Sequence, residues 1–125
     1  MADMKRGDSI AIARAYLDSL CVESRIIGAV HPTSKVKLLG TEAETPIMTA
    51  ALSHLKGGMA EFARGAKLAG AIACIGMGSN EALGEILATG AKVVKIIKPY
   101  ADPEEIYSRI EFAETHGALA VGMDV

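Results

Sequence analysis

Residues 71–123 read AIACIGMGSNEALGEILATGAKVVKIIKPYADPEEIYSRIEFAETHGALAVGM, and this stretch decides the fold class. It contains short apolar runs near residues 71–76, 93–98 and 118–123. The runs are nearly continuous rather than alternating, which is typical of strands covered on both faces of a parallel sheet. The segments between them have the length and the apolar spacing of helices. The stretch therefore predicts strands joined by crossover helices.

The helix after the 93–98 run has the clearest start in the chain. Asp102 takes the N-cap position, Pro103 the first helical position and Glu105 the third. This arrangement predicts a capping box, in which the two acidic side chains each accept a hydrogen bond from a free backbone amide. Gly117 is the expected C-terminal stop of this helix.

The same pattern extends toward the N-terminus. Residues 46–51 form another apolar run, and residues 57–70 form another helical segment. The expected strands therefore begin at residues 46, 71, 93 and 118, at nearly even spacing. Because the units are evenly spaced, we expect the strand order 1-2-3-4 with the helices on one face, and right-handed crossovers between the parallel strands.

Two architectures have this element order. An open doubly wound sheet is ordinary at this length, whereas an eightfold (β/α) barrel typically needs about 250 residues. The residues after the first strand, Leu52-Ser53-His54, contain no Gly-rich phosphate loop, and the pattern stops on a strand of the buried type. We therefore predict an α/β chain of the (β/α) TIM-barrel type that comprises part of an eightfold barrel.

An N-terminal portion precedes the repeat. Residues 8–27 are expected to form a helix that Asp8 or Ser9 caps, and residues 35–39 a short strand. We treat residues 1–125 as one incomplete barrel domain. Its parts are the N-terminal helix and short strand at 1–45 and the βαβαβαβ repeat at 46–125.

Composition and charge exclude several function classes. The chain has 125 residues, a net charge of −2, no Trp and 4% aromatic residues, so it offers neither a basic surface nor stacking platforms for nucleic acid. No apolar run approaches the roughly 20 residues that span a bilayer, and the N-terminus does not resemble a signal peptide. We expect a cytoplasmic protein without membrane partners. His31, His54 and His116 lack metal-ligand spacing, so no metal site is predicted.

Candidate site residues follow from the architecture, because parallel βα folds bind ligands at the carboxyl ends of their strands. Lys98 ends the third strand, where its charge could neutralise a phosphate or a reduced flavin ring; a solvated lysine is the alternative. Gly76 follows the second strand and could let the backbone approach a flat ligand, or could simply serve a tight turn. His54 could act as a base, although an isolated loop histidine is more often a surface group.

Several segments resemble a known family. They are TPIMTAA at residues 45–51, GAKLAG at 65–70, IIKPYAD at 96–102 and GALAVGMD at 117–124. In order and spacing they are similar to the FMN-dependent α-hydroxy-acid dehydrogenases and oxidases, the glycolate and lactate oxidase group, and in particular to its divergent bacterial branch. The likeness runs from about Tyr16 to the last residue and corresponds to the N-terminal half of the family's barrel, which implies that the chain comprises about the first four βα units of an eightfold barrel.

The resemblance implies FMN as cofactor and a small 2-hydroxy acid as substrate, with hydride transfer to the flavin. By position it implies that the cofactor-binding residues are Ala51, Leu52, Ser53, Gly76, Lys98 and Gly122. The residue types differ from the family's pattern. The family's serine falls on Gly76, its glutamine and tyrosine fall on Ile96 and Lys98, and its threonine falls on Gly122.

The resemblance leaves the catalytic residues of this chain unknown. The family's catalytic histidine, substrate-binding arginines and phosphate loops belong to the second half of the barrel. We therefore expect this chain alone to be inactive. The alternatives are a non-catalytic half-barrel that associates with itself, and a fragment of another flavin or phosphate-binding barrel, such as a relative of type-2 isopentenyl-diphosphate isomerase.

A half-barrel also predicts a homo-oligomer, because its first and last strands are open edges and its inner apolar face lacks an opposite wall. The residues expected on that inner face are Met48, Ala50, Cys74, Ile96 and Val121.

Overall fold

The computed structural model describes residues 7–24 and 26–125, and the chain divides into two units, Met1–Pro32 and Thr33–Val125. The first unit contains α1 (Ser9–Ser19), whose N-cap Asp8 accepts a hydrogen bond from the Ala11 amide at 2.9 Å. The predicted helix end at residue 27 is wrong. Leu20 is already extended, at φ −76° and ψ 127°, and residues of low helix propensity such as Val22 follow it. Residue 25, within the predicted helix, lies outside the described residues.

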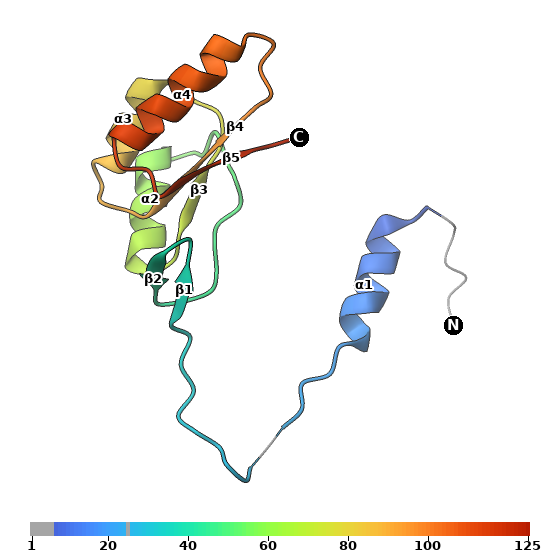
Figure 1. Cartoon of the computed structure of the whole chain (residues 1–125). Coiled ribbons are helices and arrows are strands. Elements are labelled where there is room, and N and C mark those ends of the chain that lie inside the picture. Colours follow the sequence, from blue (N-terminus) through green and yellow to red (C-terminus); the bar gives the residue numbers. More distant parts are fainter. Residues whose placement is uncertain (1–6, 25) are drawn as a thin grey trace. The chain divides into compact units, whose positions relative to one another are not determined.

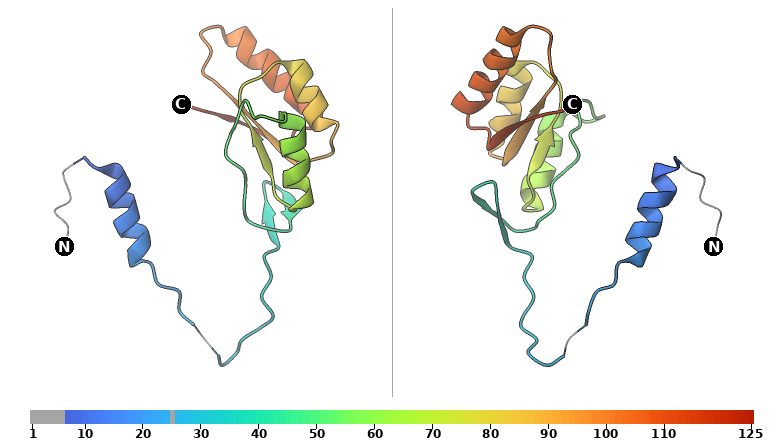
Figure 2. Two further views of the ribbon diagram at one scale, coloured as in Figure 1. Left: turned by 180° about the vertical axis from the view of Figure 1, so that it is seen from behind. Right: turned by 45° about the vertical axis from the view of Figure 1, so that its right-hand side comes forward.

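The second unit is built on a parallel sheet with the order β3-β4-β5. Its strands are β3 (Ala73–Ile75), β4 (Val93–Ile97) and β5 (Ala120–Met123). The connecting helices are α2 (Met59–Leu68), α3 (Asn80–Leu87) and α4 (Pro103–Thr115), and they cover one face of the sheet (Figures 1 and 2). The predicted order and the placement of the helices on one face are therefore confirmed.

The predicted first strand at residues 46–51 is only partly formed. It meets β3 through two isolated parallel bridges, Met48 with Ile72 and Leu52 with Ile75. Between them the Thr49 amide donates to the Ile72 carbonyl at 3.0 Å, while the Thr49 hydroxyl accepts from the Cys74 amide at 2.8 Å. A side-chain oxygen thus takes the place of a backbone acceptor, which interrupts the ladder but keeps the segment beside β3.

The core lies on both faces of the sheet. The helix-side face includes Ala63, Ile75, Leu83, Ile86 and Val93, and the opposite face includes Ile72, Cys74 and Val94, with Ile96 and Ala120 packed against them.

The prediction that Val121 lies on the inner face is wrong, because Val121 packs on the helix side. It pairs with Lys95, and paired residues of parallel strands point to the same face. Ala120 occupies the inner face instead. Cys74 is buried on the inner face, and burial raises the pKa of its thiol.

A hairpin covers the amino end of the sheet. It consists of β1 (Val36–Leu38) and β2 (Thr41–Ala43), joined by a turn in which Leu39 and Gly40 both have positive φ. The Glu44 amide donates to the Gly70 carbonyl at 3.1 Å, and Lys92 donates to the Glu42 carbonyl. The strand predicted at 35–39 is therefore present, whereas its partner β2 was not predicted. The hairpin leaves the carboxyl ends of the strands open.

The start of α4 confirms half of the predicted capping box. Asp102 accepts from the Glu104 amide at 3.0 Å, and Pro103 begins the helix. Glu105 does not return the interaction, because its carboxylate is bound by Arg109 at 2.7 Å. Among the described residues, no helix is both long and apolar enough to cross a membrane.

Candidate active site

A cavity of about 130 Å³ lies at the carboxyl ends of the strands. We call it the strand-end pocket. It brings together four of the six predicted cofactor-binding residues, Ala51, Ser53, Gly76 and Lys98, and its other lining residues are Met77, Ile96, Ile97 and Asp124. The side chains come from the segment after residue 48, the loop after β3 and the ends of β4 and β5. These elements are far apart in sequence and meet only because the strands are parallel and in register.

The remaining predicted residues, Leu52 and Gly122, do not line this pocket but support residues that do. The Leu52 carbonyl accepts a hydrogen bond from the Gly76 amide at 2.7 Å. A Cβ on Gly122 would lie 2.9 Å from Cδ1 of Ile96, so Ile96 already fills the space above this glycine. The absence of a side chain at Gly122 thus leaves room for Ile96, which gives the pocket an apolar floor.

Gly76 is required by a close approach of two chain segments. A Cβ at this position would lie 2.5 Å from Ser53 Oγ and 3.1 Å from the Leu52 carbonyl oxygen. The same Ser53 hydroxyl accepts a hydrogen bond from the Met77 amide at 2.8 Å. The loop after β3 is thereby held against residues 52–53, and the hydroxyl of Ser53 occupies the volume that a side chain at position 76 would need.

Lys98 does not project free into solvent, because its ammonium forms an ion pair with Asp124 at the end of β5. The Asp124 amide also donates to the Ile97 carbonyl at 2.9 Å, which continues the β4–β5 pairing to the rim of the pocket. Both side chains are about half exposed, so the pair contributes roughly 1 kcal/mol or less to stability. It places one positive and one negative group at the mouth of the pocket.

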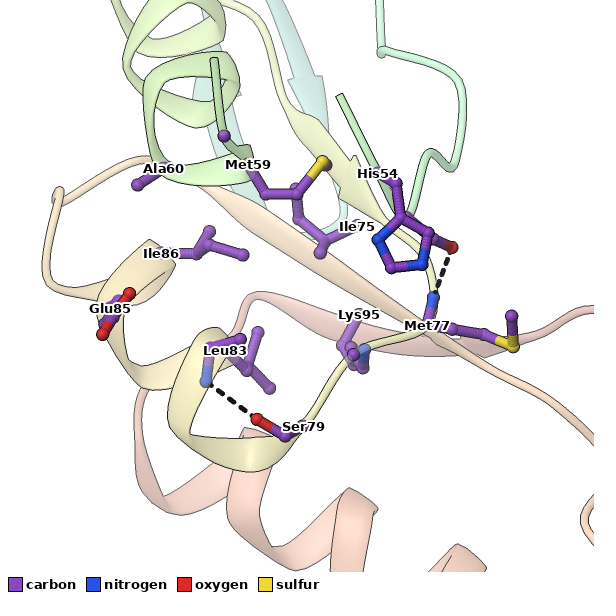
Figure 3. A pocket seen from close by; sticks show the side chains of 14 residues that line it. His54, Met59, Ala60, Ile75, Met77, Ser79, Leu83, Glu85, Ile86 and Lys95 are labelled. Atoms are coloured by element: carbon purple, nitrogen blue, oxygen red, sulfur yellow. Dashed lines mark hydrogen bonds between the residues drawn. The ribbon is translucent and has the colours of Figure 1, made fainter. Parts of the chain in front are cut away.

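A second and larger cavity, of about 400 Å³, lies between α2 and α3 (Figure 3). We call it the helix-side pocket. It shares Ser53 and Met77 with the strand-end pocket, so the loop after β3 separates the two cavities. Its walls are mostly apolar and include Met59, Ile75, Leu83 and Ile86; the polar groups at its surface are Ser53, His54, Ser79, Glu85 and Lys95.

Lys95 is the functional candidate that the sequence analysis missed. Its side chain is only 2% exposed, and its ammonium donates to the Gly76 carbonyl. From α4, Arg109 donates to the Gly78 carbonyl at 2.9 Å and lies 4.8 Å from the centre of the Tyr100 ring. Two cationic side chains therefore hold two carbonyls of the same loop. A signal was present in the sequence, because Lys95 interrupts the apolar run of β4.

The charge on Lys95 is unfavourably placed. Burial lowers the pKa of Lys95, and the nearby positive charge of Arg109 lowers it further. Glu105, the carboxylate on the same side, is already bound by Arg109. In the described part of the chain, no cluster of His, Cys, Asp and Glu could hold a metal ion.

The sequence profile of the FMN-dependent dehydrogenases matches residues 3–125. The chain belongs to this family. Solved structures of oxidases share the fold of this chain. A variant of mandelate oxidase with a C4a-OH-FMN adduct superimposes with a TM-score of 0.82 at 23% identity, over 92% of this chain and 36% of that one.

A lactate oxidase of Pediococcus acidilactici superimposes with a TM-score of 0.66 at 20% identity, over 80% of this chain and 30% of that one. The chain thus spans about a third of the length of these oxidases and has the fold of the first part of their TIM barrel. No curated protein matches its sequence significantly.

Replacing Gly76 by alanine tests the close approach of the two segments at the carboxyl ends of the strands. We expect Gly76→Ala to lower the free energy of unfolding by about 2–3 kcal/mol, because the new methyl group would lie 2.5 Å from Ser53 Oγ, which is held by the Met77 amide, and 3.1 Å from the Leu52 carbonyl oxygen. Gly65→Ala is the matched control, since it lies in α2 with no atom within 4 Å of its Cβ position. It should gain about 0.5–1 kcal/mol from helix propensity. Urea denaturation of both variants measures the difference, and equal effects would contradict the proposed packing.

Replacing Lys95 by methionine tests the buried charge. We expect Lys95→Met to be about 1–3 kcal/mol more stable than the parent at pH 7, because the variant buries no charge. The pKa of Lys95 is lowered in the folded state, so the unfolded chain holds more protons between that pKa and the ordinary value of 10.5. The parent should therefore gain stability as the pH rises through this window. The difference in free energy of unfolding between Lys95→Met and the parent should become smaller.

Urea denaturation at pH 7 and near pH 10 measures this change. Lys98→Met is the control, because its exposed ion pair should change stability by less than about 1 kcal/mol. A parent that gains stability relative to Lys95→Met as the pH falls from 10 to 7 would contradict this prediction and show that the fold stabilises Lys95 as a cation.

Proposed function

We propose that this chain forms one wall of the flavin site in an FMN-dependent oxidoreductase that acts on a small 2-hydroxy acid. One observation carries the proposal. The strand-end pocket lies at the carboxyl ends of successive strands of a barrel-type sheet, and it gathers Ala51, Ser53, Gly76 and Lys98 at one place. Family membership supports FMN as the cofactor. The substrate class rests on the family and on the named substrates of the oxidases that share the fold.

The residues present fit one edge of a flat ring. The cavity of about 130 Å³ is too small for a whole flavin mononucleotide but large enough for part of its ring system. Ile96 provides an apolar floor, and the absence of a side chain at Gly76 brings the backbone of residues 76–77 close to the cavity. Lys98 provides a positive charge at the rim, where it would stabilise a reduced ring that carries negative charge.

Bound FMN supplies a hydride acceptor for oxidation of the substrate's α-carbon. The residues of this chain then serve to bind and to orient. The loop after β3 is held by Ser53, Lys95 and Arg109, so it can position a ring without being ordered by it.

Proton removal requires a base, and none of the strand-end lining residues is a histidine. The carboxylate that lines the strand-end pocket, Asp124, forms an ion pair with Lys98. We therefore expect no turnover of lactate or glycolate by this chain alone.

Flavin titration tests the site directly. We expect the chain to quench FMN fluorescence with a dissociation constant of about 10–100 µM, because only an edge of the ring is enclosed. Riboflavin should bind within about threefold of FMN, since the contacts proposed here are to the ring and not to the phosphate. Lys98→Met should weaken binding of the reduced cofactor about fivefold and leave the oxidised form less affected.

Lys92→Met is the matched control, because Lys92 lies before β4 and contacts the Glu42 carbonyl at the opposite end of the sheet. It should bind both forms as the parent does. Absence of quenching at 100 µM protein, or equal losses in the two variants, would contradict the proposed site.

We also propose that the chain self-associates. In the described part of the chain, β5 pairs with β4 along one edge only, and Met123 at its end is 44% exposed. Met48 and Leu52 are exposed at the other side of the sheet. A second copy that covers these edges would satisfy free backbone groups and bury apolar surface. Sedimentation velocity at micromolar concentration should give at least twice the monomer mass, whereas a compact monomer would refute the proposal.

A further inference from the structure

The helix-side pocket has the features of a ligand site in its own right. Its volume of about 400 Å³ lies in the range of small-molecule sites, and its walls are mainly apolar. They come from α2, β3, α3 and β4, which follow one another along the chain. In Figure 3, Lys95 lies between Leu83 and Met77, within the ring of lining side chains. A single buried amine in an apolar pocket is a specific recognition element.

The hydrogen bonds of Lys95 leave its charge uncompensated. An ammonium group has three N–H donors, and in the described structure Lys95 uses one acceptor, the Gly76 carbonyl. The charged group that acts on the Lys95 ammonium is another cation, Arg109. Glu105 is bound by Arg109, and Glu85 is an exposed residue of the pocket lining. Among the described residues 33–125, no carboxylate forms an ion pair with Lys95, so this buried positive charge lacks a counter-charge.

We propose that the helix-side pocket binds a small, largely apolar monocarboxylate whose carboxylate group pairs with Lys95. The carboxylate accepts the remaining N–H groups and supplies the missing negative charge. The apolar body of the ligand lies against Met59, Leu83 and Ile86. One charge on the ligand matches one buried cation, and Glu85 at the pocket disfavours ligands with a second negative charge. This site is separate from the strand-end pocket and does not depend on flavin.

The test compares ligands of one shape and different charge on the full chain. Isothermal titration calorimetry with cyclohexanecarboxylate should detect binding, and cyclohexylmethanol, which has the same ring without the charge, should bind at least about tenfold more weakly. Because these ligands are compared on the unaltered protein, the result does not depend on how any variant folds. Equal binding of the two ligands, or no binding of the carboxylate at millimolar concentration, would overturn the proposal.

Two variants with the same substitution locate the site. Lys95→Met should lose about tenfold or more in affinity for cyclohexanecarboxylate and should bind the alcohol no more weakly than the parent. Lys98→Met removes the lysine that directly follows β4, at the rim of the strand-end pocket. It should leave the affinities for both ligands within about twofold of those of the parent. Loss in Lys98→Met with retention in Lys95→Met would place the carboxylate in the strand-end pocket and refute the assignment. Failure of flavin titration would not affect this result, because no flavin is present.

Discussion

The loop after β3 is fixed from both sides, and both cavities depend on that fixation. On one side the Gly76 amide and the Ser53 hydroxyl join the loop to residues 52–53 at distances that only glycine permits. On the other side Lys95 and Arg109 hold the carbonyls of Gly76 and Gly78. The loop amides thus donate to residues 52–53, whereas the loop carbonyls accept from the cationic side chains on the helix side. The loop is therefore a fixed partition between the strand-end pocket and the helix-side pocket.

The two lysines at the partition show how strand geometry divides one sequence between two chemistries. Lys95 and Lys98 are three positions apart, and successive side chains of a strand point to opposite faces. Lys95 therefore enters the apolar space under the helices, whereas Lys98 reaches the rim and meets Asp124. The ammonium group of Lys95 lowers stability because it is buried without an ion-pair partner, whereas that of Lys98 changes stability little because it is half exposed to water and paired with Asp124.

The sequence was sufficient to predict the order of the parallel strands and the helices on one face, since apolar runs and caps such as Asp102 are local signals. The family resemblance indicated which part of the barrel the chain represents. It also placed Ala51, Ser53, Gly76 and Lys98 in one region. It did not predict the face of Val121, because that face depends on register with Lys95. Nor did it reveal the role of Lys95, the engagement of Glu105 by Arg109, or the hydroxyl of Thr49 acting as a ladder acceptor. Each of these depends on contacts between distant segments.

The hydroxyl of Thr49, which accepts the Cys74 amide where a backbone carbonyl would ordinarily do so, affects local stability. The 48–52 segment is attached to β3 by isolated bridges, whereas β3, β4 and β5 share continuous ladders. Amide protons that secure this segment should therefore exchange with solvent through partial openings that leave the rest of the sheet closed. The wall that carries Ala51 and Ser53 is then a separately opening unit, able to adjust its width while the remaining strands hold their positions.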